Sequence, residues 1–146
     1  MDNQKEIILP IKNRQSTLKF LLKIIVTLGY YKYFWFLKNA NDIINLDKDQ
    51  KSLYWSIVGS SFIADMFILI TAFSGGEVSE TIKFCQSLIK GALIAITLMV
   101  LKSIEKYSLN NYGVKIRHNI FAILFVSLIY LNFAINTFEE RVKKNL

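Results

Sequence analysis

Apolar residues gather in long runs that short polar stretches separate. Two such runs are residues 53–73 and 82–101, and residues 120–138 form a third. Asp65 is the only charged residue of the first run, Lys90 lies in the middle of the second, and the third run carries no charge. A helix that crosses a hydrocarbon core of roughly 30 Å needs ~17–25 mostly apolar residues. The pattern therefore predicts transmembrane helices at these three ranges.

A fourth apolar segment, residues 16–38, is long enough to span but is interrupted by three lysines, namely Lys19, Lys23 and Lys32. Gly29 lies near its centre, where a helix can break or bend. The arm that precedes it, residues 1–15, is polar and contains Pro10, and Ser16 can cap the helix that follows. Two alternatives remain for this segment: a fourth span, or a re-entrant or interfacial helix.

Positive charge favours the second alternative, because the cytoplasmic loops of membrane proteins are enriched in Lys and Arg. If residues 16–38 span, the two sides carry nine and eight cations, and no bias results. If the segment does not span, one side carries thirteen, namely Lys5, Lys12, Arg14, Lys19, Lys23, Lys32, Lys38, Lys48, Lys51, Lys102, Lys106, Lys115 and Arg117. The other side then carries four, namely Lys83, Arg141, Lys143 and Lys144.

The expected fold is an all-α integral membrane domain covering residues 1–146, with three transmembrane helices and an N-terminal re-entrant or interfacial helix. The alternative has four transmembrane helices. Residues 39–52 are expected to form a polar loop with a short surface helix, and residues 102–119 a basic loop with a solvated or headgroup-facing His118. Residues 139–146 form a charged tail. Three spans in so short a chain leave no room for a separate soluble domain.

Asp65 and Lys90 are the internal charges of two adjoining predicted helices. If the chain folds back near residues 77–78, residues whose numbers add to about 155 share one depth, and Asp65 meets Lys90. A lone charge at mid-bilayer costs roughly 2.5–3.5 kcal/mol on insertion scales, so pairing is expected. We interpret this pair as a device that fixes the register of the hairpin, with an ion or proton pathway as the functional alternative.

Small residues recur every four positions on both helices of this predicted hairpin. Such spacing lets membrane helices approach closely. The predicted packing faces are Ser56, Ser60 and Ala64 on the first helix, and Ser87, Gly91 and Ala95 on the second. On the last helix, Asn132 and Asn136 lie one turn apart and are expected to hydrogen-bond a neighbouring helix, with a small polar cavity as the alternative.

Aromatic residues crowd the stretch Thr27–Lys38, and more follow where the first predicted span begins. Tyr and Trp rings suit the headgroup level of a bilayer. The sequence therefore predicts an interfacial aromatic belt made of Tyr30, Tyr31, Tyr33, Trp35, Tyr54 and Trp55.

The same stretch, T-L-G-Y-Y-K-Y-F-W-F-L-K, resembles the T-L-G-I-Y-x-x-Y-W-F-Y-K core of a family of small bacterial membrane proteins, catalogued as domain of unknown function 4234. The matching positions are Thr27, Leu28, Gly29, Tyr31, Trp35, Phe36 and Lys38. Lys32 stands where the family often has a second glycine, which implies a stiffer bend. The resemblance covers less than a tenth of the chain. It implies a bacterial inner-membrane protein with few helices and brings no catalytic residues.

The remaining composition narrows the chemistry. The net charge of +7 comes from cations that flank apolar runs, which argues against nucleic-acid binding and for orientation in a membrane. Cys85 is the only cysteine, so no internal disulfide can form. The sequence has no metal-binding, phosphate-binding or nucleophile motif, and we expect no catalytic residues, metal or cofactor.

The sequence therefore favours a non-enzymatic structural or accessory protein. We expect a multi-pass inner-membrane location, with residues 1–52 and 102–119 in the cytoplasm. Its partners would be the lipid bilayer and either a second copy of the chain or another membrane protein. The alternative is a small oligomeric channel, holin-like pore or transporter subunit that uses Asp65, Lys90, Asn132 and Asn136 as its polar lining.

Overall fold

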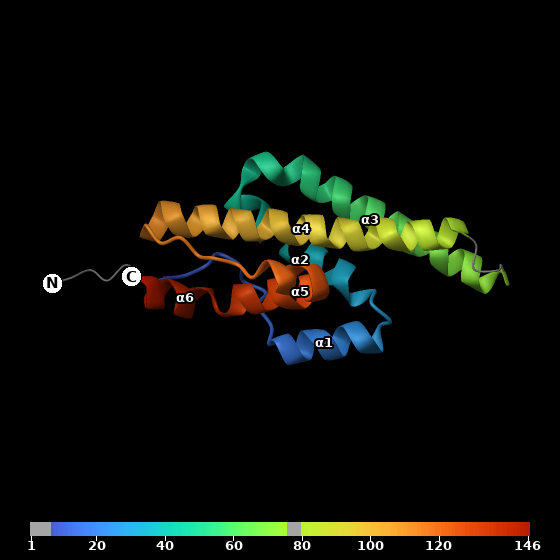
Figure 1. Cartoon of the computed structure of the whole chain (residues 1–146), viewed down its shortest axis with the longest axis horizontal. Helices are drawn as coiled ribbons and strands as arrows, with labels where there is room; N and C mark the ends of the chain where they lie inside the picture. Colours follow the sequence, from blue (N-terminus) through green and yellow to red (C-terminus); the bar gives the residue numbers. More distant parts are fainter. Residues whose placement is uncertain (1–6, 76–79) are drawn as a thin grey trace.

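The structure, a computed structural model, describes residues 7–75 and 80–146, and this part of the chain is helical without strands (Figure 1). The helices are α1 (Thr17–Val26), α2 (Tyr31–Leu46), α3 (Lys51–Phe73), α4 (Glu80–Tyr112), α5 (Ile120–Asn136) and α6 (Phe138–Asn145). A short 3-10 turn, η1 (Lys48–Gln50), joins α2 to α3. The sequence correctly predicts the all-helical class.

Two helices, α3 and α4, are long and apolar enough to cross a membrane, judged by length and composition alone. They contain the predicted runs 53–73 and 82–101 and pack against each other. At 1.5 Å per residue, the 33 residues of α4 extend about 50 Å. Because α4 ends at Tyr112, residues 102–112 are helical, where the sequence predicted a loop. Gly113 follows the helix, and its φ of +68° suits a residue without a side chain.

Residues 16–38 form two short helices instead of one long helix. The predicted break occurs at Leu28 and Gly29, which adopt φ values of 49° and 91°. Ser16 caps α1 by accepting a hydrogen bond from the Lys19 backbone N–H, as the sequence predicted. Helix α2 then runs on to Leu46, so most of the predicted polar loop 39–52 is helical. It stays helical because one of its faces is buried in the core.

The predicted third span, residues 120–138, is not one continuous helix of spanning length. The backbone of Val126 has φ −134° and ψ 37°, which kinks α5. Helix α5 ends at Asn136, and α6 begins two residues later. The apolar piece after the kink, Val126–Asn136, is too short to count as a candidate span. The structure therefore does not confirm a third transmembrane helix at these residues.

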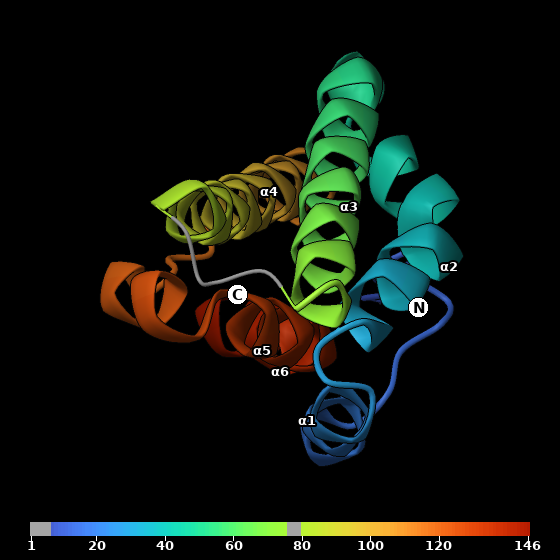
Figure 2. The same cartoon turned by 90° about the vertical axis from the view of Figure 1, so that its right-hand side faces the viewer.

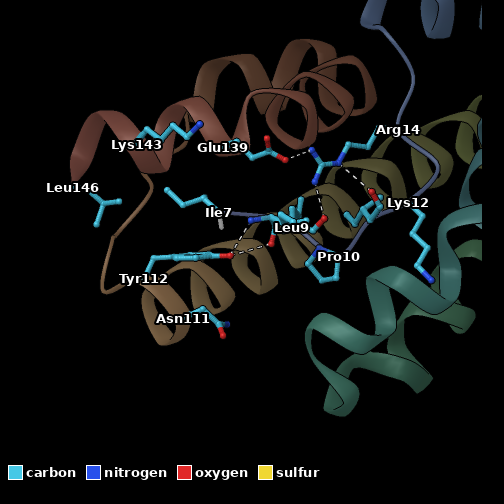
Figure 3. A pocket seen from close by; sticks show the side chains of 12 residues that line it. Ile7, Leu9, Pro10, Lys12, Arg14, Asn111, Tyr112, Glu139, Lys143 and Leu146 are labelled. Carbon is cyan, nitrogen blue, oxygen red and sulfur yellow. Dashed lines mark hydrogen bonds and ion pairs between the residues drawn. The ribbon is translucent and has the colours of Figure 1, made fainter. Parts of the chain in front are cut away.

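Of the shorter helices, α2 and α5 contact α4, whereas α1 packs mainly against α5 and α2. Figures 1 and 2 show the axis of α1 nearly parallel to that of α4, with α2 running back at an oblique angle to both. The described N-terminal arm lies between the end of α4 and α6, so Ile7, Tyr112 and Leu146 come close together (Figure 3). The chain thus brings its arm, the last turns of α4 and its C-terminal helix to one end of the molecule.

The core contains half of the six residues that the sequence assigned to an interfacial belt. Tyr33, Trp35 and Tyr54 are buried, Tyr30 and Tyr31 are half-buried, and Trp55 stays partly exposed. Ring centroids link Phe20 to Trp35 at 5.5 Å, Trp35 to Phe36 at 5.5 Å and Phe36 to Tyr54 at 6.2 Å. The belt prediction is therefore wrong for these three buried residues, because α2 has α1, α3 and α4 packed around it.

Candidate functional site

Asp65, in the middle of α3, is the centre of a polar cluster on an otherwise apolar helix. Its carboxylate lies 2.6 Å from the Lys32 ammonium and accepts a hydrogen bond of 2.5 Å from the Tyr33 hydroxyl. The Tyr30 hydroxyl donates to the Asp65 backbone carbonyl at 3.3 Å. The side chains of Lys32 and Asp65 are only 12% and 19% exposed, so the charges neutralise each other away from most solvent.

The local sequence explains this geometry. The left-handed turn at Leu28–Gly29 ends α1 and aims the first turn of α2 at α3. Neighbouring positions at the start of α2 then supply an ammonium and a phenol to the same carboxylate oxygen. The Lys32 ammonium also lies 4.8 Å from the centre of the Tyr33 ring, which adds a cation–π contact.

The predicted partner of Asp65 was Lys90, and the structure corrects this prediction. Lys90 is exposed, and among the described residues no ion pair joins it to Asp65. The prediction considered only the hairpin of α3 and α4 and assigned no role to α2. Lys32 was known from the sequence only as an interruption of an apolar segment, and nothing in that pattern placed it beside α3.

The predicted packing faces of small residues are also not used between α3 and α4. Ser56 and Ser60 are exposed on α3, as are Ser87, Gly91 and Ala95 on α4, whereas Ala64 is half-buried. A Cβ built on Gly91 would meet no atom within 4 Å. The helices instead bury larger residues, among them Tyr54 and Val58 of α3 and Ile89 and Ile96 of α4.

Asn132 and Asn136 hold the chain where it enters α1. Both side-chain amides donate to the backbone carbonyl of Gln15, at 3.1 Å and 2.8 Å, and Asn132 also reaches the Thr17 hydroxyl at 3.3 Å. The expected hydrogen bond to a neighbouring helix is thus formed, and it joins α5 to the N-terminus of α1. Gln15 in turn accepts hydrogen bonds from Tyr31 and Lys23, which extends the network to α2.

His118, predicted to be solvated or headgroup-facing, has both ring nitrogens buried. Its ring packs edge-on against Tyr130, with centroids 6.3 Å apart. Burial lowers the pKa of His118, and the Arg141 guanidinium lowers it further, whereas Glu105 and the Leu101 backbone partly offset both effects. The surroundings therefore favour the neutral imidazole more than water does.

A cleft of about 1250 Å³ opens between the arm, the end of α4 and α6 (Figure 3). Arg14 closes one side of it by pairing with Glu139 at 2.7 Å and donating to the Leu9 and Ile11 carbonyls. The Tyr107 and Tyr112 hydroxyls hold the Ile8 backbone. Through these bonds, the polar groups of the arm hold the arm in place against α4 and α6.

The polar groups at these sites form ion pairs and hydrogen bonds that hold segments of the chain to one another. In the described residues, no group of three His, Cys, Asp or Glu side chains comes together to hold a metal ion. The Asp65 carboxylate is already satisfied by the Lys32 ammonium and the Tyr33 hydroxyl. Comparison with protein-family models, curated proteins and solved structures finds no match to this chain.

Proposed function

We propose that this chain is a non-enzymatic integral membrane protein, anchored by α3 and α4, that acts through contacts with itself or a partner membrane protein. The distribution of exposed apolar side chains carries the proposal. A core helix of a soluble protein is mostly buried, whereas α3 leaves large side chains uncovered along its length, namely Phe62, Ile63, Phe67, Ile70 and Phe73. Exposed apolar area on this scale is typical of a surface that faces lipid or a partner.

Charge supports two spans better than three or four. With both ends of the chain on the side where α4 ends, sixteen of the 18 cations lie on that side or in the hairpin that enters from it, and the exceptions are Lys83 and Lys90. Lys83 alone then faces the other side, and Lys90 lies within α4. This bias exceeds the thirteen to four of a three-span topology and obeys the positive-inside rule. We therefore propose that the side with most of the cations is cytoplasmic.

In this topology, two further elements enter the bilayer partway. Helices α1 and α2 form a re-entrant hairpin whose tip, Leu28, is 88% exposed. At 1.5 Å per residue, the ten residues of α1 extend about 15 Å, half of a hydrocarbon core of roughly 30 Å. The first turns of α5 expose Ile120, Phe121 and Leu124 before the kink at Val126.

Most of the residues that were predicted to line a pore already have partners within the chain. Asp65 is neutralised by Lys32, and both Asn132 and Asn136 donate to the Gln15 carbonyl. A polar pathway along this chain would need these groups to be free. The exposed small residues Ser60 and Gly91 instead leave room for a second helix to approach α3 and α4 closely.

Extraction and cross-linking test the proposal. Membranes that contain the full chain are washed with alkaline carbonate and floated on a density gradient, and the chain is expected to remain with the lipid. In a Cys85→Ser background, Ser60→Cys is then expected to give a disulfide-linked dimer or an adduct with a partner, whereas the polar-end control Asn145→Cys is not. Release by carbonate would overturn membrane integration. Equal cross-linking at both sites would overturn association through α3.

A further inference from the structure

We propose that the open end of the α1–α2 hairpin binds anionic phospholipid headgroups through the Lys19 and Lys38 ammonium groups. The proposal rests on membrane insertion as proposed above and adds a ligand class to it. Both lysines are exposed, and among the described residues neither ammonium has an ion-pair or hydrogen-bond partner. They lie at the end of the hairpin remote from its tip.

Contacts fix the position of this open end. Lys19 lies in the first turn of α1, next to the cap at Ser16. The Lys38 carbonyl accepts a hydrogen bond of 3.3 Å from the side chain of Asn13, in the arm that precedes α1. Both lysines therefore lie beside the point where the chain enters the hairpin, which is the headgroup level of a hairpin inserted by its tip.

The positive charges of the hairpin lysines are compensated more fully the nearer the lysine lies to the tip. Lys32, nearest the tip, is neutralised by Asp65 at 2.6 Å. Lys23, in the middle, donates to the Tyr31 hydroxyl and the Gln15 side chain and lies over the Tyr31 ring. Because a charge is costly in hydrocarbon, this order is expected of a hairpin that enters a bilayer tip first. Lys19 and Lys38 are left for counter-charges that the described chain does not supply.

Exposed apolar side chains complete the surface on the tip side of these lysines. They are Leu22, Ile25, Val26, Leu28, Phe34 and Leu37. Acyl chains can cover such residues while the lysines reach the phosphates above them. Residues 7–41 contain six cations and no acidic residue, the cations being Lys12, Arg14, Lys19, Lys23, Lys32 and Lys38. This part of the chain is thus complementary to anionic lipid, and the nearest carboxylate, Asp42 in α2, accepts a hydrogen bond of 2.9 Å from the Lys12 backbone N–H.

Native mass spectrometry of the full chain, titrated with phosphatidylglycerol or phosphatidylcholine, tests this binding. The double variant Lys19→Gln/Lys38→Gln is expected to bind phosphatidylglycerol roughly 30-fold more weakly, since each lysine near an anionic surface contributes about 1 kcal/mol. Lys19→Arg/Lys38→Arg should retain binding. The matched control Lys143→Gln/Lys144→Gln removes the same charge from α6 and should leave binding unchanged.

Two results would overturn the proposal: equal affinity of the unaltered chain for both lipids, or an equal loss in the α6 control. Either would leave membrane insertion intact, because carbonate resistance and flotation report insertion separately. A double glutamine variant that floats normally but keeps its affinity within about twofold would also overturn it.

Discussion

The Lys32 ammonium and the Asp65 carboxylate, 2.6 Å apart, join the first turn of α2 to the middle of α3. They connect the N-terminal hairpin to a helix that is otherwise apolar at this level. Removing one partner of a buried pair strands the other charge, whereas replacing both removes the problem together with the interaction. The pair is therefore best tested by a cycle of single and double variants.

Asp65→Asn and Lys32→Met are each expected to lower the thermal stability of the protein in detergent more than the double variant does. Polar contacts between membrane helices couple by about 0.6 kcal/mol on average and by at most about 1.7 kcal/mol. We expect the upper half of this range, because Tyr33 donates to the same carboxylate. The measurement is unfolding followed by tryptophan fluorescence. Lys90→Met is the matched control and should change stability little, and additive losses in the double variant would refute coupling.

Tyr33→Phe should destabilise the protein by about 0.5–1.5 kcal/mol, because it removes a donor to a mostly buried carboxylate. The ring remains and keeps its edge contact with Phe62, with centroids 5.2 Å apart. Tyr30→Phe is the control, since its hydroxyl donates at 3.3 Å to a backbone carbonyl. Unfolding in detergent measures both variants, and an effect in Tyr30→Phe as large as that in Tyr33→Phe would contradict the prediction.

Single cysteines placed in a Cys85→Ser background report topology. Labels at Asn13, Asn45 and Asn145 should react with a membrane-impermeant maleimide from one side, and a label at Glu80 from the other. The reason is the concentration of cations on the side where α4 ends. Reaction of Asn145 from the side of Glu80 would restore α5 as a third span. Reaction of Asn13 and Asn45 from opposite sides would restore a span at residues 16–38.

The stability of the protein should depend on pH through His118. Its pKa is lowered in the folded protein, so the unfolded chain binds the proton first as pH falls. Full stability is expected above the ordinary histidine pKa of about 6.5, and it should decline as pH falls from there toward the folded value. Melting temperatures between about pH 8 and 5 measure this slope. His118→Phe should flatten it, and an unchanged slope would show that other groups are responsible.

Asn136→Ala should loosen the start of α1, because the Asn136 amide donates to the Gln15 carbonyl at 2.8 Å. We expect a loss of about 0.5–1.5 kcal/mol and faster amide exchange at residues 15–20. The control is Asn145→Ala, which removes an exposed amide bonded within its own helix, to Arg141. Faster exchange confined to α5 would show that Asn136 does not hold the arm.

How far the fold could be predicted from sequence depended on the range of the interactions. The two long apolar helices and the break at Gly29 follow from local composition, and both are present. The kink at Val126 has no proline or glycine to signal it. The course of α4 beyond residue 101 is fixed by burial of Ser103, Ile104 and Ser108 against other elements. Local polarity could not reveal that contact.

The candidate site was predicted in part. A lone carboxylate in an apolar run indicated that Asp65 needs a partner, and it has one. The prediction of Lys90 was wrong because equal depth in α3 and α4 takes no account of the N-terminal hairpin, whose Lys32 contacts Asp65. The aromatic residues failed for a related reason: a Tyr-rich and Trp-rich stretch suits a lipid interface and a protein core equally well. Only the neighbours of α2 decide between the two.

The bonds to Gln15 also constrain the order in which the protein is assembled during its synthesis. The Gln15 carbonyl cannot accept these hydrogen bonds until Asn132 and Asn136, which lie 117 and 121 positions further along the chain, have been synthesised. By then α3 and α4 have already been synthesised, and their hairpin can insert without α1. The N-terminal segment leaves the ribosome first and is among the last to reach its final place, so a chain truncated before Asn132 should insert α3 and α4 yet leave α1 unanchored.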